Sequence, residues 1–249
     1  MKRGVILLFV LVSTLAFGQR NVRDSTIRIF SLSPHIGLQY PFEDLAERFG
    51  HGGIVGGSLM YKTKSNWTFD AFYGFIFGNN VKEDSILKPA LVTGGLVLNN
   101  NGDLLDVFLF ERGFLAGGNI GKVFSVLGPN PNSGLHLKVG AGLMQHKIKI
   151  QEASQSAYHV IGDYAKGYDR LSNGFMLSQS LGYSHFSNYK LVNYYIGVEL
   201  FEGFTENRRT VNYDTGMHDG RQRFDIVGSF VFRWYIPIYK RQPQDFYFY

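Results

Sequence analysis

The stretch FDIVGSFVFRWYI, Phe224–Ile236, has side chains that alternate with a period of two, which is the pattern of a β-strand. One face is entirely apolar and consists of Phe224, Ile226, Gly228, Phe230, Phe232, Trp234 and Ile236. The opposite face carries two opposite charges, Asp225 and Arg233. In a transmembrane barrel the apolar face of a strand contacts lipid and the polar face lines the lumen. The stretch therefore predicts a membrane-spanning strand whose charges are enclosed.

The composition of the 249-residue chain agrees with an all-β membrane protein. Aromatic residues make up 16% of the chain and there are 30 glycines, which favours extended, tightly turned structure over a helical enzyme. The chain has no cysteine, so no disulfide supports the fold. The net charge is +5, and its excess lies near the expected short turns, at Lys62, Lys64, Lys122, Lys190, Lys240 and Arg241. Anionic headgroups are a plausible partner for this basic rim, whereas nucleic acid is not a partner for an exported chain.

The N-terminus has the pattern of a secretory signal peptide. Lys2 and Arg3 precede an apolar run from Val5 to Phe17, and small residues end it, so we expect a signal peptide over residues 1–18 and a mature chain from Gln19. A membrane anchor is the alternative, but the run is short for a spanning helix. Because no other segment reaches the roughly 20 apolar residues that a spanning helix needs, we expect the chain to cross a membrane as strands.

Eight amphipathic segments follow the signal, and together they predict an eight-stranded antiparallel up-and-down transmembrane β-barrel over residues 19–249. The segments are 26–40, 54–62, 67–78, 107–124, 135–150, 175–186, 192–200 and 224–236. Short turns follow the second, fourth and sixth segments, as periplasmic turns do in outer-membrane barrels. The other connections are long and are expected to be extracellular loops, at about 41–53, 79–106, 151–173 and 204–221. The second loop carries an apolar patch, 86–98, that could fold over the barrel mouth.

Aromatic residues near the short turns support this orientation. Five of them are expected on the lipid-facing side of different strands, as an aromatic girdle: Tyr61, Trp67, Tyr183, Tyr194 and Trp234. Such rings sit where the apolar and headgroup layers of a bilayer meet.

These features, with the aromatic C-terminus from Asp245 to Tyr249, resemble the small outer-membrane β-barrel proteins of Gram-negative bacteria. The chain is similar to the OmpA/OmpX-like and OmpW-like barrels and to the "outer membrane protein beta-barrel domain" group. The resemblance implies integral location in the outer membrane, contact with its lipid and lipopolysaccharide, and insertion by the barrel-assembly machinery. That machinery reads a terminal aromatic strand, which here is either Phe224–Ile236 or the terminal residues 246–249.

A barrel of eight strands is only just wide enough for side chains to fill its interior. Charges enclosed there must be paired, so we expect an ion-pair network that plugs the lumen. Its members are Asp70, Glu111, Lys138, Glu199, Asp225 and Arg233, with His35 and His136 as hydrogen-bonded fillers. The alternative interpretation is a narrow ion-conducting pore through the same residues.

The loops contain two sets of candidate residues. Tyrosine and arginine are enriched at interface hot spots, so a surface for a partner protein, glycan or lipopolysaccharide is expected at Tyr164, Tyr168, Arg170, Arg208 and Arg209. A rim-located lipid-modifying enzyme would use acid/base or metal-binding groups, and the best candidates are Asp214, His218 and Asp219 with His159 and Asp163. Because such loop residues mostly form turns, we expect no enzyme, metal or cofactor. The sequence favours a structural or interaction barrel, such as a subunit of an outer-membrane secretion or assembly complex.

Overall fold

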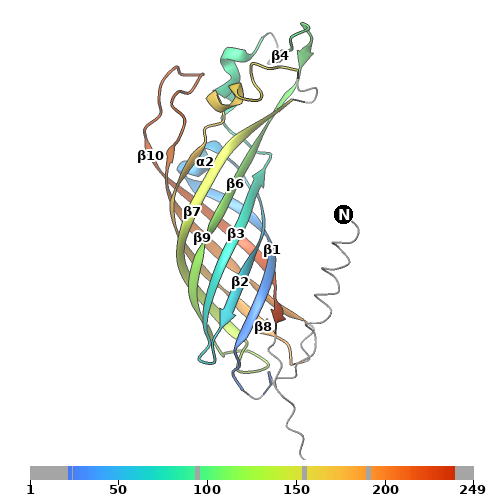
Figure 1. Cartoon of the computed structure of the whole chain (residues 1–249), viewed down its shortest axis with the longest axis vertical. Helices are drawn as coiled ribbons and strands as arrows, with labels where there is room; N and C mark the ends of the chain where they lie inside the picture. The colour runs from blue at the N-terminus through green and yellow to red at the C-terminus, as the bar shows by residue number, and fades with distance from the viewer. Residues whose placement is uncertain (1–21, 24, 93–95, 153–155, 189–191, 239–249) are drawn as a thin grey trace, which may run out of the picture.

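The computed structural model describes residues 22–23, 25–92, 96–152, 156–188 and 192–238, and its long strands form a closed ring (Figure 1). Each strand pairs antiparallel with the next along the chain, and the last also pairs with the first. In the described part of the chain the ring has eight members: β1 (Ile29–Glu43), β2 (Gly52–Lys62), β3 (Trp67–Gly78), β6 (Val107–Phe124), β7 (Gly134–Glu152), β8 (Ser172–Phe186), β9 (Asn193–Asn207) and β10 (Gln222–Trp234). The predicted eight-stranded up-and-down barrel is confirmed.

The stretch that decided the fold closes the ring. β10 pairs with β1 from His35 opposite Arg233 to Glu43 opposite Asp225. The strand is interrupted at Tyr235, after which β11 (Ile236–Ile238) resumes the pairing with β1. The register on β1 is the same on both sides of the interruption, and Tyr235 keeps the inward position, where its buried ring stacks on Phe186 with 5.1 Å between ring centroids.

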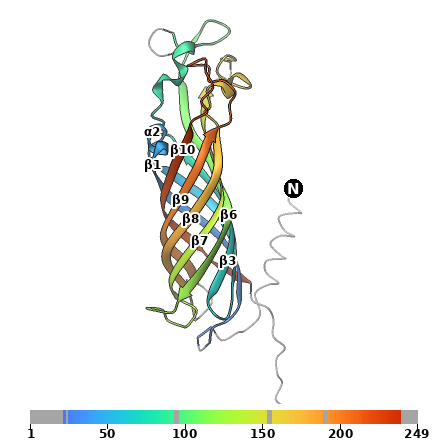
Figure 2. The ribbon, with the colours of Figure 1, turned by 90° about the vertical axis from the view of Figure 1, so that its left-hand side faces the viewer.

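The two ends of the barrel differ, and Figures 1 and 2 show the long connections at one end and the short turns at the other. The long-loop end carries α2 (Asp44–Arg48), the 3₁₀ helices η1 (Asp84–Ala90) and η3 (Tyr164–Gly167), and a small ladder of β4 (Val97–Leu98) with β5 (Leu104–Leu105). β9 extends to Asn207, further than its apolar alternation indicated, because it stays paired with β8 up to Ser172 opposite Asn207. The expected signal peptide 1–18 and the terminal aromatic residues 246–249 lie outside the described residues.

Alternation along each strand separates an enclosed face from an exposed apolar one. In β1, for example, Ser31, Ser33 and His35 are buried, while Leu32 is 46% and Ile36 61% exposed. Exposed apolar side chains occur on every strand of the ring, which an aqueous monomer would not tolerate but a lipid-facing wall requires. None of the helices in the described residues has the length and apolar character that crossing a bilayer demands.

Candidate functional site

Four of the six predicted lumen charges lie together, toward the short-turn end of their strands. Arg233 Nη2 lies 2.7 Å from both carboxylate oxygens of Glu199, and Lys138 Nζ lies 3.5 Å from Glu199 Oε1 and 3.6 Å from Asp70 Oδ2. Ser58 accepts a further hydrogen bond from Arg233 at 3.3 Å. All four charged side chains are at most 3% exposed. Two acids and two bases thus form a balanced cluster that fills the lumen and that we call the ion cluster.

Glu111 and Asp225 do not join the ion cluster, although the sequence grouped them with it. Glu111 accepts a hydrogen bond from Gln39 at 3.0 Å, and Asp225 is paired with His146 at 2.8 Å and accepts a hydrogen bond from Thr205. Their strand positions lie nearer to the long loops, so the distance along the barrel separates them from Arg233. The single expected network is therefore three separate polar groups.

Apolar side chains separate these groups, a feature that the sequence did not predict. On the long-loop side of the ion cluster, Phe72 and Phe201 pack with 5.9 Å between ring centroids. They belong to a buried cluster that also contains Ile54, Ile76, Leu115, Met144, Met176 and Val227. Each of these residues occupies an inward position of its strand, so a dry layer crosses the lumen there.

The short-turn end of the lumen is also closed. The segment before β1 packs there, because Asn132 donates hydrogen bonds to the carbonyls of Val22 and Ser25 and accepts them from the Ile27 amide and Lys62 Nζ, at 2.8–3.0 Å. Lys62 is fully buried at this point. A second polar chain lies alongside, in which His136 bonds to both Thr68 and Ser184, and Ser184 to Tyr235. The turn that contains Asn132 therefore acts as a clamp, in the sense that it fixes the segment before β1 against the short-turn end of the barrel. Local turn signals in the sequence do not predict this contact.

The loops over the barrel mouth are tied to each other by ion pairs. Glu83 pairs with Arg48 at 2.8 Å and with Arg170 at 3.1 Å, and Arg170 also pairs with Asp214 at 2.6 Å. These contacts connect α2 to three different connections. The apolar patch of the second loop is buried as well, since Ile86, Leu87 and Val97 belong to the same apolar cluster as Phe72 and Phe201.

The five loop residues expected to bind a partner divide into two groups. Tyr168 is buried, and that burial raises the pKa of its phenol. Arg170 is paired with Asp214. Arg209 donates hydrogen bonds to both carboxylate oxygens of Asp169, a contact that raises the pKa of the Arg209 guanidinium. Tyr164 is 58% exposed, and Arg208 is partly exposed although it bonds to Asn173 and Glu206. Of the expected set, only these two present a surface to a partner.

The rim residues considered for catalysis are engaged in holding the loops. Asp214 pairs with Arg170, Asp219 with Arg223, and Asp163 with Lys166, while His218 Nδ1 lies 2.9 Å from the carbonyl of Arg209. Within the described ranges, no three His, Asp or Glu side chains are grouped to hold a metal ion.

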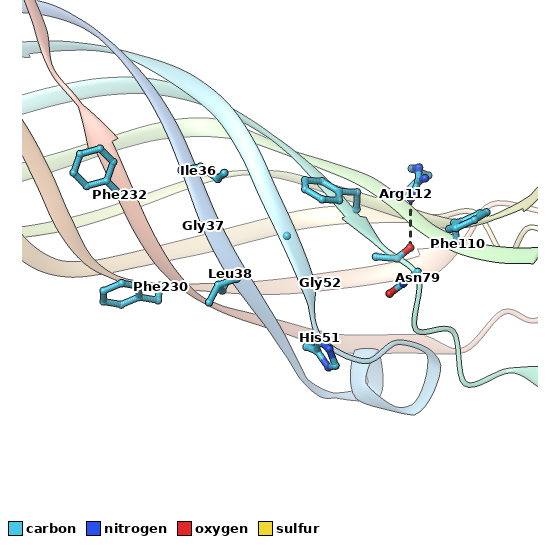
Figure 3. A pocket seen from close by; sticks show the side chains of 13 residues that line it. Ile36, Gly37, Leu38, His51, Gly52, Asn79, Phe110, Arg112, Phe230 and Phe232 are labelled. Atoms are coloured by element: carbon cyan, nitrogen blue, oxygen red, sulfur yellow. Dashed lines mark hydrogen bonds between the residues drawn. The ribbon is translucent and has the colours of Figure 1, made fainter.

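The outer wall of the barrel carries a groove of about 700 Å³ near the long-loop end (Figure 3). Ile36 and Leu38 of β1 and Phe230 and Phe232 of β10 form one side of it. Arg112 stands at the other side, where its Nη1 donates hydrogen bonds to the carbonyls of Gly78 and Glu111. No carboxylate in the described residues lies within 4 Å of this guanidinium, and the register places Lys147 directly opposite it on β7. The groove is thus apolar with a basic upper edge.

The five expected girdle aromatics lie near the short-turn end of their strands. Trp67 and Trp234 are 43% and 57% exposed, and Lys122 Nζ lies 5.1 Å from the centroid of the Trp67 ring system. The others are Tyr61, Tyr183 and Tyr194. Tyr183 donates a hydrogen bond to the carbonyl of Leu127 in a short turn, as an aromatic side chain with one apolar and one polar end does at a bilayer edge.

A closed ring of antiparallel strands, with charges inside and an exposed apolar belt outside, defines a transmembrane β-barrel. Neither the models of known protein families nor the curated proteins contain a match to this chain. Among solved structures, the chain is similar to Ail, the attachment invasion locus protein of Yersinia pestis, with 7% identity, coverage of 84% of this chain and 98% of that chain, and a TM-score of 0.45. It is similar to the N-terminal β-barrel domain of Pseudomonas aeruginosa OprF, with 13% identity, coverage of 82% and 97%, and a TM-score of 0.34. For the outer membrane protein OprG of Pseudomonas aeruginosa the identity is 10%, the coverage 86% and 99%, and the TM-score 0.32.

Proposed function

We propose that the protein is an integral outer-membrane barrel that acts as a structural or interaction protein through its exterior and not through its lumen. The observation that carries this proposal is the ion cluster, which lies between the dry layer and the closed short-turn end of the lumen. Arg233, Glu199, Lys138 and Asp70 form ion pairs with one another across the lumen, and the dry layer around Phe72 excludes water above them. An ion that entered would have to break a balanced buried cluster and cross an apolar layer, both of which are costly.

The membrane, the orientation and the lipid partners are part of the same proposal. The expected export signal and the exposed apolar belt support the outer membrane, with the short turns in the periplasm and the long loops outside. Lipid and lipopolysaccharide would contact the belt, and their anionic groups would suit Arg112 at the upper edge of the wall groove. Insertion would depend on the barrel-assembly machinery.

A protein partner is expected at the barrel wall more than at the mouth. The mouth arginines Arg48, Arg170 and Arg209 are already paired with acids of this chain, so few loop charges are free to bind another molecule. The wall, in contrast, presents grooves and exposed apolar side chains. A barrel of this kind would serve as a subunit of a larger outer-membrane secretion or assembly complex.

Planar-bilayer recording tests the closed lumen. We expect the purified protein to give no steady conductance, and Arg112→Met, a change on the outer wall, to give none either. The lumen variant Arg233→Ala with Phe72→Ala removes one charge and one ring from adjacent layers, and we expect it to produce small, flickering currents. Steady current through the unaltered protein would overturn the proposal in favour of a narrow pore.

A further inference from the structure

Two polar side chains interrupt the apolar belt on the outer wall between β8 and β9. Gln179 Nε2 donates a hydrogen bond to Glu202 Oε1 at 3.2 Å, and both side chains are on the exposed face of the sheet. Neither residue was singled out by the sequence pattern, because Gln179 replaces one apolar position in a regular alternation and Glu202 lies beyond the predicted end of its strand at residue 200.

The depth of this pair within the belt follows from the strand positions. On β8 the outward residues run from Phe175 near the long loops through Leu177, Gln179 and Leu181 to Tyr183 of the aromatic girdle, so Gln179 is the middle one. Its cross-strand neighbours are also apolar and outward, Val139 on β7 and Leu200 on β9. Gln179 therefore lies near the middle of the bilayer, and Glu202 lies one outward step above Leu200.

In a lipid environment such a pair has too few partners. None of the Lys or Arg nitrogens in the described residues comes within 4 Å of the Glu202 carboxylate. A primary amide has two donors and an acceptor, and a carboxylate accepts several hydrogen bonds, so one mutual bond leaves most of this capacity unused. Polar groups that face lipid tails are destabilising, and they are found where another protein covers them.

The wall beside the pair is shaped to receive another surface. A groove of about 460 Å³ lies across β8, β9, β10 and β1, with Gln179 and Leu181 at one side and Tyr40 at the other. Gly228 takes an outward position in this groove, where the Phe42 ring leans over it, and a Cβ there would come within 2.8 Å of that ring. Because Gly228 has no side chain, the outer surface of the barrel is recessed at this position.

We propose that this face, from β8 to β10, is the interface with a second copy of the chain. The donor and the acceptor are self-complementary: across a two-fold axis, Gln179 of each copy can bond to Glu202 of the other, and the same patch serves on both sides. Interactions of this kind associate transmembrane segments, where lipid gives no hydrophobic driving force. The inference rests on the proposed function and specifies its partner.

Single-cysteine cross-linking tests the interface without background, because the chain has no cysteine of its own. Leu181→Cys lies next to Gln179 on the outward face, and Val55→Cys on β2 lies on the opposite side of the ring with similar exposure, 46% and 45%. We expect a covalent dimer from Leu181→Cys in native membranes and in vesicles with a large excess of lipid, and none from Val55→Cys.

Substitutions of Gln179 and Glu202 then test whether the dimer depends on their hydrogen bonds or only on contact between the two surfaces. Gln179→Leu with Glu202→Leu should leave a folded barrel, seen by its heat-modifiable migration on gels, but lower the cross-linked fraction about tenfold. Glu202→Gln retains hydrogen-bonding capacity and should retain the dimer. Equal cross-linking at both cysteines, a monomer in light scattering at all detergent concentrations, or cross-linking only to a different protein would each overturn the inference. Any of these results with a silent bilayer recording would leave the proposed function standing.

Discussion

Replacing Arg233 by methionine tests the energetic basis of the closed lumen. The guanidinium contacts Glu199 and Ser58, and its side chain is only 2% exposed. Methionine is apolar and unbranched, so it partly fills the space but leaves Glu199 with Lys138 alone, at 3.5 Å. The ion cluster then holds two acids and one base. An uncompensated buried charge is the dominant consequence, and breaking such a pair costs about 3–5 kcal/mol.

A second change should recover part of this loss. Glu199→Gln in the Arg233→Met background removes the surplus negative charge and leaves Lys138 with Asp70, which restores the balance of the cluster. We expect the double variant to be more stable than the sum of the two single changes predicts, by about 2 kcal/mol. Arg112→Met on the outer wall is the matched control and should cost less than about 1 kcal/mol, because in the described residues no carboxylate pairs with this half-buried guanidinium.

Urea unfolding in phospholipid vesicles measures these free energies. The chain has two tryptophans, Trp67 and Trp234, and both lie on the lipid-facing surface, so their emission reports the loss of bilayer contact on unfolding. Additive effects of Arg233→Met and Glu199→Gln, or a cost for Arg233→Met no larger than that of Arg112→Met, would contradict the assignment of a paired, water-excluded cluster.

Three further outcomes follow from contacts outside the ion cluster. Asn132→Ala should loosen the segment before β1 and leave Lys62 without its side-chain acceptor, at a cost of about 2–3 kcal/mol and with new protease cleavage at the short-turn end. Asn132→Asp keeps the acceptor for Lys62 but loses the two bonds donated to the carbonyls of Val22 and Ser25, so protease cleavage should increase there too. Glu83→Gln should speed hydrogen exchange of the loop backbone, with an effect on the free energy of unfolding below about 1 kcal/mol. Partial burial raises the pKa of Asp219, but the hydrogen bond and charge of Arg223 outweigh it and lower the pKa. This contact therefore contributes above the ordinary carboxyl pKa of about 4 and is lost as the pH falls through the lowered value, so loop proteolysis should increase below about pH 4 and be constant from about pH 5 to 8.

The strands could be predicted because each position in them has a binary choice. A side chain on a strand of this barrel faces either lipid or lumen, so alternation at Phe224–Ile236 determines both the element and its orientation. For the same reason, the pairing of Arg233 with Glu199 could be predicted in part from the sequence, since both are charged residues at inward positions. The stacking of Tyr235 on Phe186 could not be predicted, because the two residues are distant in sequence.

The mouth and the base could not be predicted, since their contacts depend on which loops meet. The interpretation of Tyr168 and Arg170 as a binding surface assumed that loop residues point into solvent. In the structure Arg170 joins Glu83 of one loop to Asp214 of another, two residues that no local pattern relates. Likewise, Asn132 has the sequence context of a turn, and its role as a clamp depends on the chain before β1 returning to the same place.

Within the described residues, the carboxylates of Glu111 and Glu202 both lie without a base, and their surroundings distinguish what each implies. Glu111 is fully enclosed, with one bond from Gln39 and its Oε2 against the bare backbone of Gly78, so no other molecule can reach it in the folded barrel. Glu202 also has no base, but it lies on the outward face of β9, where Gln179 gives it one hydrogen bond and its remaining acceptor sites face away from the barrel. At Glu111 the missing hydrogen-bond donors are therefore a matter of internal packing, whereas at Glu202 they indicate assembly. In the proposed dimer, Gln179 of the second copy supplies a donor to Glu202.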